Sequence, residues 1–346
     1  MRVRHHPYCT IIPPHILEEV AKRGTQQQKD WALNNLTLAG FLRGQRHVAP
    51  TLRMAAAAGF KNRVVFDNQN EGGDPPRGRQ ARIETSPDSP DATVNEAFNG
   101  AGATYDLYFD VFQRNSVDDK GLTLVSYVHF ATDFNNAFWD GSQMIYGDGD
   151  NQIFGRFTKC IDVIGHELTH GVTQYEANLT YSGQSGALNE SFSDVFGSLV
   201  KQRSLGQTAE TADWLIGEGL FTPSIKGVAL RSMKEPGTAY DDPVLGKDPQ
   251  PGHMNDYVNT FSDNGGVHIN SGIPNRAFFL TATALGGNAW DKAGKIWYVA
   301  LRDRMRSNYN FKRAARATVS VAKELFGDTS TEMKAVQDAW RAVGVL

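Results

Sequence analysis

The sequence predicts an α+β protein in which a β-rich upper domain and a mainly helical lower domain flank one central helix. Three observations support this fold class. Between residues 62 and 158, runs of β-branched and aromatic residues such as 122–130 are typical of strands. From residue 185 to residue 346, apolar residues recur mainly with helical spacing. The segment 157–177 has apolar residues on one flank and polar residues on another, as expected for a helix between two domains.

A small helical segment is predicted to precede both domains. Pro13 and Pro14 fit an extended entry and the first turn of a helix that continues to Val20. A second helix is expected from Thr25 to Gly44. Two short helices bury too little apolar surface to be stable alone, so this segment needs a partner.

The predicted units are a helical head, a β-rich domain, the central helix and a helical domain, with bounds 1–53, 54–159, 160–177 and 178–346. Further helices are expected over 94–114, 187–199 and 332–341.

Charge is distributed unevenly among these units. Residues 1–54 hold eight Lys and Arg against three Asp and Glu, a surplus of +5 that leaves −8 for the rest of a chain whose net charge is −3. The head and the body are therefore oppositely charged.

Composition excludes several classes of protein. The net charge of −3 argues against nucleic acid as a partner. No apolar run approaches the roughly 18 residues that span a membrane. Cys9 and Cys160 are the only cysteines, so we expect no disulfide framework. The N-terminus lacks an apolar stretch behind its charges, so we expect secretion by a route other than a Sec signal peptide, with a cytoplasmic location as the alternative.

The pattern His-Glu-x-x-His at 166–170 predicts a metal site. His166 and His170 stand four residues apart, so on a helix they lie on one face and can bind a single ion. Glu167 lies beside them, where it can reach a water at the metal without binding the metal itself. The same five-residue pattern also occurs by chance on surface helices, so the residues that follow decide its interpretation.

A second predicted helix supplies the remaining ligand. It has an apolar stripe, with Glu190 and Asp194 on the other face. Glu190 completes a set of two histidines and one glutamate, which leaves the fourth position of tetrahedral zinc open to water, as a catalytic site requires. Asp194 can orient a ligand imidazole, and Asn189 is expected in the same supporting role. These residues predict one catalytic zinc ion.

Several further blocks occur in the order found in a known family. They are Asn-Asn-Ala-Phe-Trp at 135–139, Gly-Asp-Gly-Asp at 147–150, Ala-Leu-Arg-Ser-Met at 229–233, and the segment 263–272. On these residues the chain resembles the thermolysin-like zinc metallopeptidases and, within them, the protealysin branch with its short pro-segment. The resemblance covers nearly the whole chain and implies the two-domain thermolysin-like fold.

The resemblance implies a neutral endopeptidase that cleaves protein and peptide substrates. Zinc lowers the pKa of water and polarises the substrate carbonyl, while Glu167 acts as the general base. His268 and Tyr181 match the family's donors to the tetrahedral oxyanion, and Asp263 matches the residue that orients His268.

Substrate-binding residues also follow from the resemblance. Asn136 and Ala137 match an edge strand to which an extended substrate adds through backbone hydrogen bonds. Arg231 matches the residue that holds the carbonyl beyond the cut. An apolar pocket is expected, with cleavage before bulky apolar residues; its lining would be Phe154, Phe157, Val163, Leu220 and Leu230.

The family's calcium sites are only partly matched. Acidic residues occupy several of the matching positions: Asp162, Asp213, Glu190 and Glu218. Lys201 and Leu215 stand where two other ligands belong, and Val228 replaces a carboxylate at another site. A lysine ammonium can pair with the remaining acids and substitute for an ion. We therefore expect no obligatory calcium.

The head resembles a pro-segment that inhibits its own catalytic domains until it is removed. The cut is expected between Pro50 and Phe60, in an alanine-rich junction, before Leu52, Met54 or Phe60. The alternative is a permanent N-terminal subdomain. A weaker hypothesis is that Cys9 reaches the zinc as a thiolate, against the default of a small packed residue.

Two other functional classes were weighed. A gluzincin aminopeptidase is expected to show 18 residues between the second histidine and the glutamate and an upstream Gly-x-Met-Glu-Asn motif. Here 19 residues separate His170 from Glu190, and that motif is absent. A non-catalytic zinc-binding or adhesion protein would normally lack Glu167 or His268. The sequence thus favours a monomeric zinc endopeptidase made as a zymogen.

Overall fold

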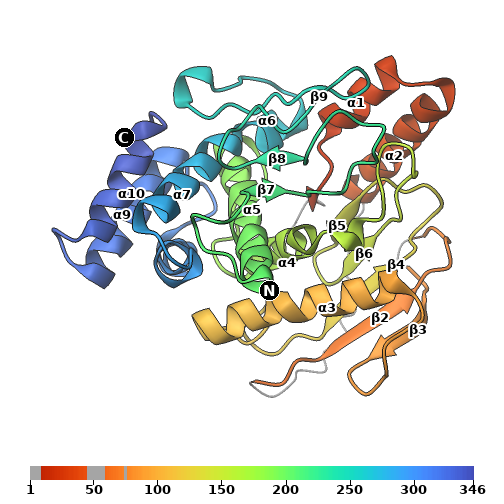
Figure 1. Cartoon of the computed structure of the whole chain (residues 1–346), viewed down its shortest axis with the longest axis horizontal. Helices are drawn as coiled ribbons and strands as arrows, with labels where there is room; N and C mark the ends of the chain where they lie inside the picture. The colour runs from red at the N-terminus through yellow and green to blue at the C-terminus, as the bar shows by residue number, and fades with distance from the viewer. Residues whose placement is uncertain (1–8, 45–58, 74–75) are drawn as a thin grey trace.

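The computed structural model describes residues 9–44, 59–73 and 76–346, and shows the predicted α+β architecture (Figure 1). The head consists of a short strand β1 (Cys9–Thr10) and the helices α1 (Pro14–Arg23) and α2 (Gln26–Gly44). Pro13 is the N-cap of α1 and Pro14 its first residue, in agreement with the fixed φ of proline at a helix start. Ile16, Leu17 and Val20 are the buried face of α1.

The upper domain is built on one mixed sheet of six strands in the order β1-β5-β6-β4-β2-β3. The body contributes β2 (Arg63–Asp67), β3 (Arg79–Ile83), β4 (Leu124–Val128), β5 (Ala137–Trp139) and β6 (Met144–Tyr146). The strands β2, β4 and β6 are parallel neighbours, whereas β3 and β5 are antiparallel to theirs. The sixth strand is β1 of the head, which pairs antiparallel with β5. The sequence analysis expected helices in the head but did not assign this strand.

One long helix covers the sheet. The helix α3 (Ala92–Asp106) continues into a π-turn, η1 (Leu107–Val111). Asp91 caps α3 by accepting a hydrogen bond from the Thr93 backbone N–H at 2.8 Å. A helix was predicted over 94–114, so the element is confirmed with slightly earlier bounds.

Two buried helices form the centre of the molecule, α4 (Ile161–Tyr175) and α5 (Gly183–Leu205). A 3-10 turn, η2 (Phe157–Lys159), precedes α4. The helices approach closely at Gly165 and Gly197. A Cβ on Gly165 would lie 3.0 Å from the Gly197 Cα, and one on Gly197 would lie 2.4 Å from the Asp162 carbonyl oxygen. This close approach brings the two histidines of α4 next to the acidic face of α5.

The lower domain is mainly helical. Its remaining helical elements are η3 (Met254–Asp256), α6 (Asp263–Asn270), α7 (Gly272–Leu285), η4 (Trp290–Gly294), α8 (Lys295–Val299), η5 (Ala300–Arg304), α9 (Phe311–Phe326) and α10 (Thr331–Ala342). Two small antiparallel ladders join β7 (Leu215–Ile216) to β8 (Arg231–Ser232) and β9 (Asp241–Asp242) to β10 (Gly246–Lys247). Trp297 stacks on Trp340 and ties α8 to α10. In the described part of the chain, no helix is long and apolar enough to cross a membrane.

Candidate active site and metal centre

Three buried side chains converge between α4 and α5. His166 and His170 come from α4 and Glu190 comes from α5. One ligand atom from each lies within 4.8 Å of the others. The four-residue spacing on α4 puts both imidazoles on one face, and the close helix crossing places Glu190 opposite them. The three predicted ligands are therefore brought together.

The hydrogen bonds of the histidines leave one nitrogen of each ring directed at the centre of the cluster. His166 Nδ1 lies 2.8 Å from Asp194 Oδ1, and His170 Nδ1 lies 2.9 Å from Asn189 Oδ1. With Nδ1–H donated in this way, each Nε2 carries a lone pair. The two Nε2 atoms face each other at 3.0 Å. Two lone pairs at that distance repel each other unless a metal ion or a proton lies between them.

Glu190 supplies independent support for a cation. Its Oε2 atom is buried and has no hydrogen-bond partner in the described part of the chain. It lies 3.4 Å from His166 Nε2 and 3.5 Å from His268 Nε2. A buried carboxylate oxygen without a hydrogen bond is costly, and a metal ion would compensate it. Two imidazole nitrogens and one carboxylate are the donor set of an open catalytic zinc site. The residues present therefore fit a zinc ion.

Glu167 lies beside the cluster but is held differently. Its Oε2 accepts a hydrogen bond from the Trp139 backbone N–H at 3.0 Å, which ties it to strand β5. Its Oε1 is buried without a hydrogen-bond partner among the described residues. Burial raises the pKa of this carboxyl above its usual range. A carboxylate with one fixed oxygen and one free oxygen is suited to accept a proton.

His268 faces the cluster from α6. The helix begins with a left-handed turn in which Gly265 has φ 89°, and this turn folds Asp263 back onto the histidine. Asp263 Oδ1 lies 2.6 Å from His268 Nδ1, and Oδ2 accepts the His268 backbone N–H at 2.8 Å. Burial opposes a charge on the ring, but Asp263 and Glu190 outweigh it and raise the pKa of His268.

Tyr181 completes this side of the site. Its hydroxyl lies 3.2 Å from His268 Nε2 and donates a short hydrogen bond to Glu190 Oε1. His268, Tyr181 and Asp263 are thus brought together as the sequence analysis expected. Their catalytic roles remain predictions.

The head occupies the edge of the sheet beside these residues. Strand β1 pairs with β5, with Thr10 opposite Phe138. The Ile11 N–H donates to the Ala137 carbonyl at 3.1 Å, and the Ile12 N–H donates to Asn136 Oδ1 at 3.0 Å. The predicted substrate-binding edge is therefore filled by the chain's own residues.

Two carbonyls, of the last residue of β1 and of the residue after it, meet donors from the lower domain. The Thr10 carbonyl lies 3.0 Å from His268 Nε2. Arg231 Nη1 donates to the Ile11 carbonyl at 3.3 Å, while its Nε and Nη2 donate to the Asp194 carboxylate at 2.9 and 2.8 Å. Asp194 thus links a metal-cluster histidine to the arginine.

The residues expected to line the apolar pocket are all buried. They belong to one core cluster with Ile11 and Ile12 of the head: Phe154, Phe157, Val163, Leu220 and Leu230. This cluster also contains most of the other buried apolar residues of the protein, and the role of the five residues in specificity remains a prediction. The Cys9 side chain and most of the expected cleavage zone, including Leu52 and Met54, lie outside the described part of the structure; Phe60 is described and exposed.

Some supporting residues were not identified from the sequence. Ser193 Oγ lies 3.0 Å from His170 Nδ1, and Asn275 Nδ2 donates to Asp194 Oδ2 at 2.8 Å. Ser193 stands three residues after Glu190 on the same helix, so helical spacing could have indicated it. Asn275 is far from Asp194 in sequence and gives no comparable signal.

The partly matched calcium position holds a lysine in ion-pair contact with acids. Lys201 Nζ lies 2.7 Å from Asp213, 3.1 Å from Glu218 and 4.0 Å from Asp162. Burial opposes the ammonium charge, but the neighbouring acids outweigh it and raise the pKa of Lys201. Leu215 lies in β7, directly after Asp213 and Trp214, and Val228 is exposed.

Comparison with known proteins decides the family. The thermolysin metallopeptidase catalytic domain matches residues 68–174, and the thermolysin metallopeptidase alpha-helical domain matches residues 177–345. This chain belongs to the thermolysin family of metallopeptidases. It is a zinc metalloendopeptidase, and this membership argues against both the aminopeptidase and the non-catalytic alternatives.

Similar proteins extend over almost the whole chain. An extracellular metalloprotease of Pectobacterium carotovorum subsp. carotovorum is 50% identical over 99% of this chain and 98% of its own length. Protease PrtS of Photorhabdus sp. strain Az29 is 46% identical over 100% of this chain and 94% of its own. The solved precursor of protealysin from Serratia proteamaculans superposes with a TM-score of 0.90, at 50% identity, over 98% of this chain and 100% of that one. The thermolysin-family chain described here has the structure of a zymogen precursor.

Proposed function

We propose that this metalloendopeptidase is held inactive by its own head, which lies in the substrate groove in the direction of a substrate. One observation supports the proposal: the backbone of the segment from Thr10 to Ile12 contacts four residues that we propose bind the substrate backbone. Its N–H groups bind Ala137 and Asn136, and its carbonyls bind His268 and Arg231. Shielding the groove in this way blocks access of other peptides.

The positions of the two carbonyls identify the bond that takes the place of the scissile one. The Thr10 carbonyl meets His268, the proposed oxyanion donor, and the Ile11 carbonyl meets Arg231, the proposed anchor beyond the cut. The Thr10–Ile11 peptide bond therefore occupies the place of the cleaved bond. Ile11 is bulky and apolar, which supports cleavage before such residues in a pocket lined by the five buried residues named above.

The proposed mechanism assigns a task to each side chain. When one zinc ion is bound by His166, His170 and Glu190, it polarises the carbonyl and lowers the pKa of water. Glu167 accepts the proton of the attacking water and passes it to the leaving nitrogen. His268 and Tyr181 donate hydrogen bonds to the developing oxyanion, and Asp263 keeps His268 oriented and charged. Asp194 and Asn189 fix the ring orientations of the two histidines.

We further propose a monomer that acts outside the cell on protein and peptide substrates. The names of its extracellular relatives support secretion. The Lys201 cluster supports the absence of obligatory calcium, because an internal ammonium already faces the acids. Removal of the head is proposed to follow a cut between Pro50 and Phe60.

The test uses the full-length Glu167→Ala chain. Expressed alone, it is expected to stay uncut, and a trace of active enzyme is expected to trim it at the wild-type site, as read by N-terminal sequencing. Normal maturation of the variant without added protease would refute self-processing. Equal casein digestion by uncut and trimmed wild-type chains would refute the inhibitory role of the head.

A further inference from the structure

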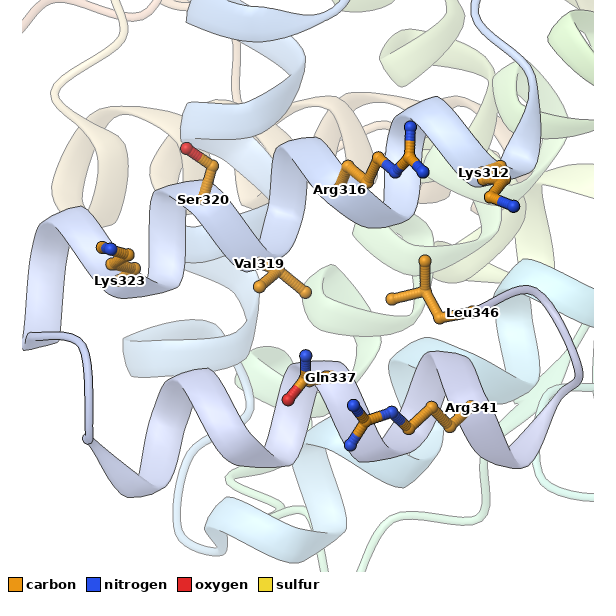
Figure 2. A pocket seen from close by; sticks show the side chains of 8 residues that line it. All are labelled: Lys312, Arg316, Val319, Ser320, Lys323, Gln337, Arg341 and Leu346. Atoms are coloured by element: carbon orange, nitrogen blue, oxygen red, sulfur yellow. The ribbon is translucent and has the colours of Figure 1, made fainter.

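A groove lies between α9 and α10, at the opposite end of the molecule from the head (Figure 1). It has a volume of about 520 Å³. Figure 2 shows the lining side chains on both helices, with Val319, Gln337 and Leu346 in the space between them. Four lining residues are cations, Lys312, Arg316, Lys323 and Arg341, and none of the described lining residues is Asp or Glu.

Three of the cations form a row on α9, with spacings of four and seven residues. Lys312, Arg316 and Lys323 lie along one face of α9, whereas Ala314, Ala315 and Val321 are buried on its other side. At a rise of 1.5 Å per residue, the row is about 16 Å long, with about 6 Å between positions four residues apart. Arg341 faces this row from α10.

Two of these cations have no carboxylate partner among the described residues. Lys323 pairs with Asp328 at 2.8 Å and Arg341 with Asp338 at 3.4 Å. Across the residues that the structure describes, no carboxylate lies within ion-pair distance of Lys312 or Arg316. The segment 311–346 holds six Lys and Arg against four Asp and Glu, a surplus of +2 in a chain of net charge −3. Positive charge is thus concentrated in this groove of an acidic protein.

We propose that this groove binds an acidic peptide segment in extended conformation. Side chains on one face of an extended peptide recur every second residue, about 6.7 Å apart. This repeat is close to the 6 Å spacing of Lys312 and Arg316, which stand one helical turn apart, so neighbouring Asp or Glu side chains on one face of the peptide match this pair. Lys323, about 10.5 Å beyond Arg316, would meet an acidic side chain further along the peptide. Val319 offers an apolar contact and Gln337 an amide between the helices. A single phosphate would engage only one end of such a row.

In a peptidase, the acidic segment is a part of the protein substrate remote from the bond that is cut. The assignment of the acidic segment to a protein substrate rests on the proposed function, whereas the binding of an acidic peptide in the groove does not. The groove would then retain acidic substrates at the surface and lower their KM, with the strongest effect at low ionic strength.

The experiment measures binding of a fluorescent nine-residue peptide with Glu at every second position to the full-length chain by anisotropy. The groove variant is Lys312→Gln with Arg316→Gln. The matched control is Arg313→Gln with Lys334→Gln, because these exposed residues lie on the same helices but outside the groove lining. We expect the groove variant to weaken binding about three- to tenfold and the control less than about twofold.

Equal weakening in both variants would overturn the proposal, because only net charge would then matter. Binding of anionic vesicles without binding of the acidic peptide would also overturn it and indicate a membrane surface. In cleavage assays, the groove variant should raise KM for a substrate with an alternating-Glu tail but not for the same substrate with a Gln tail. If neither substrate is cleaved by the trimmed enzyme, the proposed function fails while the binding result stands.

Discussion

The helices α4 and α5 carry a buried and a partly exposed cluster of charge that are neutralised in different ways. At the metal centre, one oxygen of Glu190 lacks a hydrogen bond in the described part of the chain, and two imidazole nitrogens face each other. At the second cluster, Lys201 lies among three acids, and Asp162 also accepts the Gly217 N–H at 2.9 Å. The second cluster contains its own cation, and the first requires one from solution. A site that needs an ion is therefore recognised by buried polar atoms without a hydrogen-bond partner, and less by the number of its acidic residues.

The largest expected effect is the loss of peptide cleavage, and it distinguishes the general base from the zinc ligands. Glu167→Ala should abolish peptide cleavage while zinc is retained, because Glu167 lies beside the cluster and is not one of the three converging groups. Glu190→Ala should lose zinc and stability together, since ion binding is linked to the folded state. Zinc content and thermal midpoints of both variants provide the measurement. Loss of metal from Glu167→Ala would contradict the assignment.

His268 is a charged group of the metal centre that is not a ligand. His268→Ala should raise the activation free energy of the trimmed enzyme by about 3 kcal/mol. This lowers kcat by roughly two orders of magnitude, with little change in KM. The effect falls on kcat and not on KM because an oxyanion donor acts mainly in the transition state. Steady-state kinetics on a peptide substrate give both constants. A weakened KM at normal kcat would make His268 a ground-state contact.

The second cluster is tested by removing its cation. Lys201→Met should lower the free energy of unfolding by about 2 kcal/mol, because it removes the counter-ion of the buried Asp162 and of the partly exposed Asp213 and Glu218. Lys201→Arg is the control that keeps the charge. Selective calcium chelation with zinc kept saturated should barely move the thermal midpoint of the wild-type chain. A large calcium-dependent rise in that midpoint would show that the lysine does not replace an ion.

The smallest expected effect is a pH dependence in the docking of the head on the catalytic domains. His15 Nε2 lies 3.1 Å from the Tyr240 hydroxyl, and burial lowers the pKa of His15 from 6.5 to about 4. Asp263 and Glu19 act to raise this pKa, whereas His268 and Arg231 act to lower it further. Docking should therefore be fully stabilised above pH 6.5 and weaken as the pH falls toward 4, because only the released head takes up the proton. Between pH 7 and pH 5 the weakening is at most about 20-fold.

This pH effect can be measured through access to the groove. A fluorescent active-site peptide that does not titrate in this range should bind the full-length Glu167→Ala chain faster at pH 5 than at pH 7. His15→Gln keeps a partner for Tyr240 but cannot titrate, so its pH dependence should be smaller. An identical pH dependence in both chains would assign the effect to other groups.

The sequence predicted what depends on local spacing. The ligands of α4 follow from a four-residue repeat, and Glu190 and Asp194 follow from the same repeat on α5. The two-domain fold was predicted because strand-like and helical periodicities occupy different parts of the chain. The resemblance supplied His268 and Arg231, whose positions in the fold depend on contacts between distant segments.

Other features could not be predicted because they join residues far apart in the chain. The N–H that holds Glu167 belongs to the Trp139 backbone, which has no side-chain signature. Strand β1 has two residues, too few for any periodicity, and exists because β5 offers an unpaired edge. The contact of His15 with Tyr240 likewise depends on how the head packs on the body.

Metal analysis of the purified full-length chain tests the central contrast most directly. After exhaustive chelation of calcium with zinc kept saturated, elemental analysis should find one zinc per chain and no calcium, and Glu190→Ala should remove the zinc. The Lys201→Met variant should keep its zinc, because its cluster is separate from the metal ligands. Retained calcium in the wild-type chain, or a wild-type chain without zinc, would contradict the account.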